Sequence, residues 1–321
     1  MPFRIRPDHH LTDEFRRAAA GHLREAIDII EERPNGTHEA IHDFRKNLKR
    51  VRSLYRLVAR DIPAFREREN ARLRDVAKSV STIRDAAALI DTAVYLKENA
   101  RDAEEGETLG RIVSALEMRR DRMLGAAESG LEQRLSEIPG MLGEAIAALD
   151  TIEFNGRQSK NARLIAKGWR KTVRGAQKAI ASCHDEASAE TFHTLRKRTQ
   201  DYRAYHTLLR PLWPTAMKAK YEAASQLVDL LGHVHDLDVL CELVEAEPHL
   251  FPGADDLARL LDAIIFRQQE DRNAALDRAE DVFPKDYDKE ADRIALLWRA
   301  VANRDDPADC VRGPKPVFPA A

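Results

Sequence analysis

Aromatic residues are scarce in this sequence of 321 residues, and glycine and proline are scarcer. Phe, Trp and Tyr together make up 6% of the chain, which has 14 glycines and 14 prolines. The prolines lie between segments of regular apolar periodicity, so the segments themselves are free of the strongest helix breaker. Charged residues reach 33%. This composition is typical of a soluble, mostly helical protein.

Cysteine and long apolar runs are also lacking. The three cysteines form no C-x-x-C pair, and free thiols in a reducing cytosol are the simplest interpretation of Cys183, Cys241 and Cys310. The first residues contain no apolar segment of the signal-peptide kind. No apolar run approaches the roughly 18 residues that a membrane span requires. We therefore expect a cytoplasmic protein without a membrane segment.

Net charge is nearly absent, but the charges are unevenly distributed. With 52 basic and 54 acidic residues the formal charge is −2, which by itself predicts no polyanionic partner. Residues 157–178, however, contain eight Lys or Arg and no Asp or Glu, and residues 37–60 contain seven basic residues against two acidic ones. This distribution predicts a sharply polarised surface.

The segment 42–56 predicts one helix with two opposed faces. At helical spacing the apolar side chains fall on one side and the cationic ones on the other. Arg45 with Lys49, and Arg52 with Arg56, are like-charge pairs four residues apart, which destabilise a helix unless an anion lies between them. A plain solvated face is the alternative. The apolar face consists of Ile41, Phe44, Leu48, Val51, Tyr55 and Val58, and the cationic face of His42, Arg45, Lys46, Lys49, Arg52 and Arg56.

The same pattern recurs 151 residues later. His193, Arg196 and Lys197 repeat the spacing of His42, Arg45 and Lys46, and the sequence R-D-A-A-A-L at 84–89 matches H-D-L-D-V-L at 235–240 at the same offset. Two matches at one long offset indicate an internal duplication.

Periodicity and breakers predict four helices in each half. We expect them at residues 11–32, 37–60, 64–100 and 109–135, with Thr37 capping the second and an acidic turn at 104–107. The second half predicts helices at 159–181, from a Ser188 cap to near 211, at 215–247 and at 255–282, with a short extra helix at 287–303. The predicted organisation is a first half at 1–137, a linker at 138–156, a second half at 157–303 and a disordered tail at 304–321. This is an all-α fold of two four-helix bundles related by a pseudo-two-fold axis.

The helix predicted at 159–181 has a basic face of its own. Its cations recur every three or four residues and form a continuous positive row. The row consists of Lys160, Arg163, Lys167, Arg170, Lys171, Arg174 and Lys178.

These motifs resemble the conserved-histidine α-helical domain, or CHAD, family. Each H-x-x-R-K helix is followed 42 residues later by an R-D or H-D motif, and the resemblance extends from about residue 11 to about residue 303. It implies an all-helical fold and binding of inorganic polyphosphate along basic helix faces. The second copy departs from the first at Gln200 and Asp201, which replace Lys49 and Arg50, so its basic face is expected to be weaker. The implied contacts are His42, Arg45, Lys46, Lys49, Arg50 and Arg52, then His193, Arg196, Lys197 and Arg203.

Further residues complete the candidate site. We add Arg56 from the first basic helix and three cations from the helix at 159–181. The supporting positions are the R-D and H-D motifs and Lys78, which lies on the helix predicted at 64–100. The added contacts are Lys167, Lys171 and Arg174 with Arg56, and the supporting residues are Lys78, Arg84, Asp85, His235 and Asp236.

Two other classes of function remain as alternatives. One is a metal-dependent or phosphohistidine enzyme built on His42 and His193, because residues 38–42 match the zinc signature H-E-x-x-H. His38 would lie in a fraying first turn among cations, which disfavours a metal. The other is a nucleic-acid-binding scaffold, although the basic faces lack stacking aromatics, Trp169 being the one exception. The sequence shows no phosphate loop or catalytic triad, so we expect a non-enzymatic protein without a cofactor.

Overall fold

The computed structural model describes residues 3–251 and 253–303, with the backbone alone at 82–85 and 124–129. These residues form helices and connecting segments, and no strand occurs among them. The prediction of an all-α fold is confirmed. The internal duplication stays a prediction, and the predicted tail at 304–321 lies outside the described residues.

Ten α-helices follow one another along the described chain. The first half contributes α1 (Leu11–Glu32), α2 (Thr37–Leu57), α3 (Pro63–Ser79), α4 (Ser81–Glu98) and α5 (Ala103–Ala148). The second contributes α6 (Gln158–Asp185), α7 (Ala189–Leu208), α8 (Pro214–Ala246), α9 (Ala254–Val282) and α10 (Tyr287–Ala302). Short 3₁₀ helices η1 (Leu149–Thr151), η2 (Arg210–Leu212) and η3 (Pro248–Leu250) lie at three of the turns.

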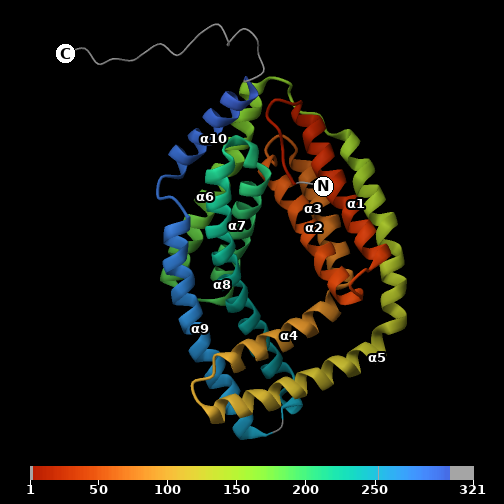
Figure 1. Ribbon diagram of the computed structural model, residues 1–321, viewed down its shortest axis with the longest axis vertical. Coiled ribbons are helices and arrows are strands. Elements are labelled where there is room, and N and C mark those ends of the chain that lie inside the picture. Colours follow the sequence, from red (N-terminus) through yellow and green to blue (C-terminus); the bar gives the residue numbers. More distant parts are fainter. Residues whose placement is uncertain (1–2, 252, 304–321) are drawn as a thin grey trace, which may run out of the picture.

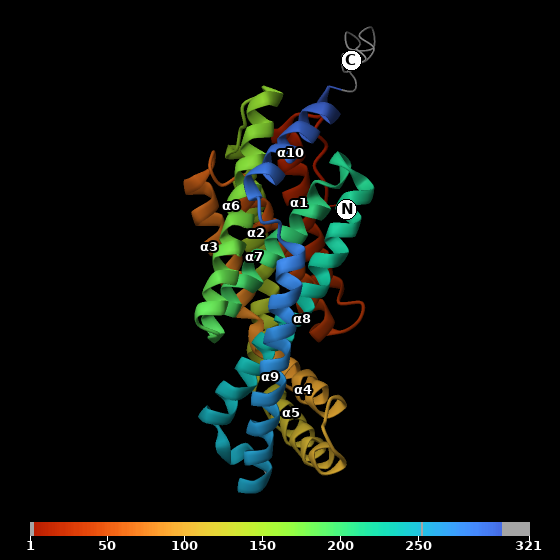
Figure 2. The ribbon, with the colours of Figure 1, turned by 90° about the vertical axis from the view of Figure 1, so that its left-hand side faces the viewer.

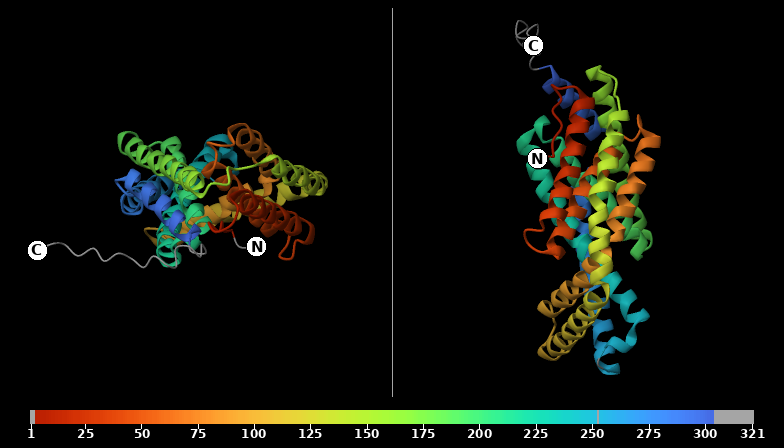
Figure 3. Two further views of the ribbon diagram at one scale, coloured as in Figure 1. Left: turned by 90° about the horizontal axis from the view of Figure 1, so that it is seen from above. Right: turned by 90° about the vertical axis from the view of Figure 1, so that its right-hand side faces the viewer.

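The helices form an elongated molecule with two side-by-side groups above and a mixed group below. Figure 1 shows α1, α2 and α3 with the later part of α5 on one side, and α6, α7 and α10 on the other. Seen from above, these two groups lie next to each other (Figure 3). The view in Figure 2 places α3 and α6 toward one edge and α8 toward the other. We call the mixed group below, made by α4, the start of α5, the end of α8 and the start of α9, the lower lobe.

The buried cores do not follow the two halves of the chain. One core is continuous across both halves and includes Phe15 and Tyr55 together with Trp169 and Tyr202. A second core fills the lower lobe with residues such as Leu116 from α5 and Leu240 from α8. Each core therefore holds the two halves together, whereas the sequence predicted one core for each four-helix bundle.

Helix α5 corrects two predictions from the sequence. It runs for 46 residues and continues through Pro139, so the predicted acidic turn at 104–107 is its first turn and the predicted linker at 138–156 is helical as far as Ala148. Asp102 caps it by accepting from the Glu105 amide, and acidic side chains stabilise a helix start. An interior proline costs about 3 kcal/mol. Buried Ile138 and Leu142 flank it, so core packing offsets that cost.

Two further boundaries differ from the prediction. The segment predicted as one helix at 64–100 breaks at Val80 into α3 and α4. Helix α2 begins at Thr37 itself, and its N-cap is Gly36 at φ 87°, a conformation that glycine adopts without strain. The predicted Ser188 cap of α7 is confirmed, since its side chain accepts from the Thr191 amide.

Helices α6 and α2 approach too closely for a side chain at Gly168. A Cβ there would lie 1.8 Å from the Leu57 carbonyl oxygen. We predict that Gly168→Ala destabilises the protein by about 1–3 kcal/mol, the usual cost of overpacking. Gly143→Ala is the control, because a Cβ at this exposed position of α5 meets nothing within 4 Å. Thermal and urea unfolding of both variants tests this, and equal stabilities would contradict the close approach.

Candidate anion-binding site

Helices α2 and α7 are joined through one carboxylate. Asp201 of α7 is 2% exposed and accepts hydrogen bonds from Ser53 Oγ at 2.7 Å and from Arg56 Nη2 at 2.5 Å and Nε at 2.9 Å. Burial lowers the pKa of Arg56, but the charge of Asp201 and the hydrogen bonds to it raise that pKa above its ordinary value. Arg56 was predicted from the sequence to contact the anion. Its positive charge is instead offset by the carboxylate of Asp201, and this ion pair holds the two helices together.

Arg52 lies next to this junction and is also engaged. Its Nε donates to Asn70 Oδ1 of α3 at 2.8 Å, and Arg56 donates to the same oxygen at 3.4 Å. Burial, followed by repulsion from Arg56, lowers the pKa of Arg52 to about 10. The C-terminal part of the α2 basic face, with Arg52 and Arg56, thus belongs to the interface with α3 and α7.

Lys49, one turn earlier on α2, faces the cations of α7. Burial, followed by repulsion from Arg196, Arg45 and Arg203 in that order, lowers the pKa of Lys49 to about 8, while Asp236 opposes them. The residue is nevertheless exposed to water. Neighbouring protein therefore reduces the hydration of the ammonium group although water still reaches the side chain.

Two histidines complete this group from α7 and α8. The rings of His193 and His235 lie with their centroids 5.0 Å apart. Burial lowers the pKa of His235 to about 4, with Arg196, His193, Lys49 and Lys197 adding to the effect. Burial also lowers the pKa of His193, followed by Lys197 and Arg196. Both imidazoles are therefore neutral at pH 7.

The group carries several cations and little compensating charge. Asp236 Oδ1 lies 3.8 Å from Arg196 Nη1, which is long for an ion pair. The buried Arg196 Nε and His193 Nδ1 have no hydrogen-bond partner among the described residues. Like charges with lost hydration destabilise one another, and an anion between them relieves the repulsion. We call this group the central cluster, made of Arg45, Lys49, His193, Arg196, Lys197, Arg203 and His235.

The remaining candidates lie outside the central cluster or at its edge. Lys46 is exposed and 3.6 Å from Asp43, and the Arg50 guanidinium donates to Asn47 at 3.3 Å. His42 is half-buried on α2, and Lys78 is exposed in the last turn of α3. The side chains of Arg84 and Asp85 lie outside the described residues. The cations of α6 that the sequence assigned to the site, namely Lys167, Lys171 and Arg174, form a separate exposed row.

The metal-like motifs do not converge. His38 lies in the first turn of α2, and among the described residues no three His, Cys, Asp or Glu side chains are placed to share a metal ion. Around residues 233–238 the side chains diverge. His233 packs on the Tyr95 ring at 4.2 Å, and Asp238 pairs with Arg272 at 3.1 Å.

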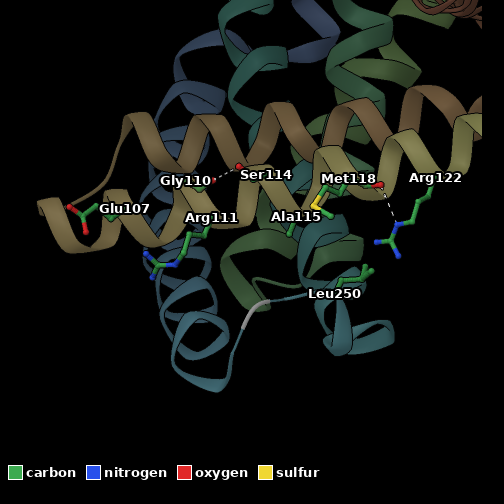
Figure 4. A pocket seen from close by; sticks show the side chains of 8 residues that line it. All are labelled: Glu107, Gly110, Arg111, Ser114, Ala115, Met118, Arg122 and Leu250. Carbon is green, nitrogen blue, oxygen red and sulfur yellow. Dashed lines mark hydrogen bonds between the residues drawn. The ribbon is translucent and has the colours of Figure 1, made fainter.

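An open pocket of about 640 Å³ in the lower lobe holds none of the candidate residues. Figure 4 shows Arg111, Met118 and Arg122 along α5 with Leu250 facing them. Arg111 is paired with Asp256 at 2.5 Å, and Arg122 donates to the Met118 carbonyl at 3.2 Å. Because both guanidinium groups are engaged, this pocket is a weaker anion site than the central cluster.

The sequence undervalued two residues of the site. From the sequence, Asp201 was interpreted only as weakening the second basic face. A single acidic residue among cations is also the signal of a structural ion pair. His235 was predicted only as a supporting residue. The signal for its importance was its distance of 42 residues from His193, which equals the distance from His42 to Arg84.

The described residues thus form an all-α fold in which the basic faces of α2 and α7 converge on one cationic cluster. The family model described as the CHAD domain matches residues 17–245, and the chain belongs to that family. Among solved structures it is similar to the CHAD domain from the plant Ricinus communis, with 18% sequence identity and a TM-score of 0.48 over 94% of this chain and 97% of that one. The comparison with curated proteins gave no match. No described helix is both long and apolar enough to cross a membrane.

The depressed pKa of His235 predicts that the free protein loses stability on mild acidification. Below pH about 6.5 the unfolded chain protonates this imidazole, while the folded protein does not until pH about 4. Its contribution therefore lowers stability as pH falls from 6.5 to 5, by at most about 1.4 kcal/mol per pH unit.

Urea unfolding across that range, with wild type and His235→Gln, measures the effect. We expect a shallower slope for the variant. His9→Gln is the control, since His9 is exposed near the N-terminus. Parallel slopes for wild type and His235→Gln would show that this imidazole is not the one responsible.

Proposed function

We propose that this protein binds inorganic polyphosphate at the central cluster and does not turn it over. The observation that carries the proposal is the junction of α2 and α7 at Asp201, which brings Lys49 of α2 close enough to Arg196 of α7 for the two cations to repel each other. A polyphosphate offers about one negative charge per unit and no bases, so a binder needs convergent cations. Arginine supplies a planar fork for phosphate oxygens and lysine a point charge.

The surroundings of the cluster favour polyphosphate over nucleic acid. Binders of single strands add aromatic platforms to a basic groove. Here Phe44 and Tyr55 of α2 are fully buried, and Trp169 is 1% exposed with its Nε1 donating to Glu290 at 2.8 Å. Trp169, the one exception in the sequence, is therefore a core residue.

An enzyme on phosphorylated substrates is the other candidate. The neutral imidazoles of His193 and His235 beside Arg196 are compatible with a phosphohistidine. Release of orthophosphate from polyphosphate, or phosphate retained on His193, would favour the enzyme over the binder. We further propose that binding places the protein on polyphosphate granules in the cytoplasm.

Removing charge from either helix should weaken binding to one shared site. We predict that Lys49→Gln and Arg196→Gln each raise the Kd for tripolyphosphate roughly tenfold, the size expected for a lost charged hydrogen bond. The double variant should be non-additive, because both cations contact one ligand. Neither variant should lose stability, since each relieves repulsion between cations.

Calorimetric titration at several salt concentrations gives the affinities, and Lys97→Gln on the exposed surface of α4 is the control. Log K should fall linearly with log salt for wild type. Two independent ligands per protein, each lost with one variant, would contradict a shared site.

Binding should also take up protons near pH 8.5. The pKa of Lys49 is about 8 in the free protein, so the amine is largely neutral at that pH. A bound polyanion favours the ammonium form and raises the pKa, so a proton is taken from the buffer. Titrations in buffers of different ionisation enthalpy measure this uptake. Lys49→Arg should keep the affinity and abolish most of the uptake, and unchanged uptake would exclude Lys49 as its source.

A further inference from the structure

Helix α6 presents a second set of cations that the central cluster does not use. Six exposed side chains recur at three- and four-residue steps over about 27 Å of helix. None has a carboxylate partner among the described residues. Arg170 is not one of them, because it pairs with Asp288 at 2.6 Å and Asp292 at 3.1 Å. We call these six the α6 row: Lys160, Arg163, Lys167, Lys171, Arg174 and Lys178.

The α6 row runs beside the α2–α7 junction. Gly168 lies against the end of α2, and a Cβ on Gly175 would lie 2.9 Å from Arg198 Nε of α7. Lys171 is three residues after one glycine and four before the other, so it borders the same contact face. The middle of the row is therefore adjacent to both helices of the central site.

Arg198 of α7 lies at the contact between α7 and α6. It contacts α6 at Gly175, and together with Arg56 it opposes the rise in the pKa of Tyr205 that burial and Asp201 cause. Arg198 is thus close to the Asp201 junction on one side and to α6 on the other. Arg198, which the sequence did not identify, therefore adds a cation of α7 beside α6 and near the Asp201 junction.

The two surfaces differ in hydration. Arg196 and His235 of the central cluster are half-buried, and burial lowers the pKa of each. The α6 cations are exposed and spaced along one helix. An anion gains most where it relieves repulsion among dehydrated cations, whereas exposed ion pairs contribute little each and act together.

We propose that the α6 row is an extension of the binding site that only long polyphosphate chains occupy, while oligophosphates of a few units bind the central cluster alone. This inference rests on the proposed function. A chain held at the cluster keeps its next units at high local concentration beside α6, so weak contacts there add affinity without a second independent binding event.

A charge-matched pair of triple variants tests the proposal. Lys167→Gln/Lys171→Gln/Arg174→Gln removes three cations of the α6 row, and Arg24→Gln/Lys97→Gln/Lys218→Gln removes three exposed cations from α1, α4 and α8. Each is titrated with tripolyphosphate and with long-chain polyphosphate. For the α6 variant we expect roughly tenfold weaker binding of the long chain, the size expected for three exposed ion pairs. The slope of log K against log salt for the long chain should become less steep by about 2.

The same variant should bind tripolyphosphate as wild type does, and the control should bind both ligands normally. Equal losses for both ligands, no loss for the long chain, or a second long chain bound independently at α6 would each overturn the inference. Wild-type protein that binds neither ligand would instead refute the proposed function.

Discussion

The carboxylate of Asp201 is the constraint on which the arrangement of this protein depends. It is buried between α2 and α7 and accepts from Ser53 and Arg56. Without it, no carboxylate would lie at the junction to offset the repulsion between the basic faces of these two helices. A buried carboxylate with two strong donors fixes their crossing point, and removing one partner of such a pair is strongly destabilising. The cations beyond the crossing, Lys49 and Arg196, are thereby kept close although they repel each other.

That repulsion is balanced by cores that join the halves. The larger core includes α2 and α7 themselves, and the smaller core links α4 and α5 to α8 and α9 in the lower lobe. Because both cores need both halves, separating the basic helices would expose apolar surface in two places. Binding sites are commonly built this way, with local interactions that disfavour folding offset by packing elsewhere. The neutral His193 and His235 show the same balance, since the fold holds them in a place where protonation is unfavourable.

Periodicity in the sequence was sufficient to identify the buried and cationic faces of α2. The 151-residue offset was sufficient to select His193 and His235 as the counterparts of His42 and Arg84. Periodicity was insufficient for contacts across helices. Arg56 and Lys49 lie two turns apart on one basic face, yet one is neutralised by Asp201 and the other is not. Helical spacing tells which side of a helix a residue occupies, whereas the partner on that side comes from another part of the chain. The course of α5 through Pro139 was missed for a similar reason, because tertiary packing overrides a local breaker.

The match to the family model ends at residue 245, inside α8, but the fold does not end there. Glu290 of α10 is buried and accepts from Trp169 Nε1 at 2.8 Å, from the Tyr202 hydroxyl at 3.0 Å and from Lys220 Nζ at 2.5 Å. A chain stopped at 245 would leave the buried donors of α6 and α7 without an acceptor, a cost of about 1–3 kcal/mol for each. Tyr202 follows Asp201 directly on α7. The helix that carries the central cluster is therefore held on one side by α2 and on the other by α10, so residues beyond the family match help to hold the site in place.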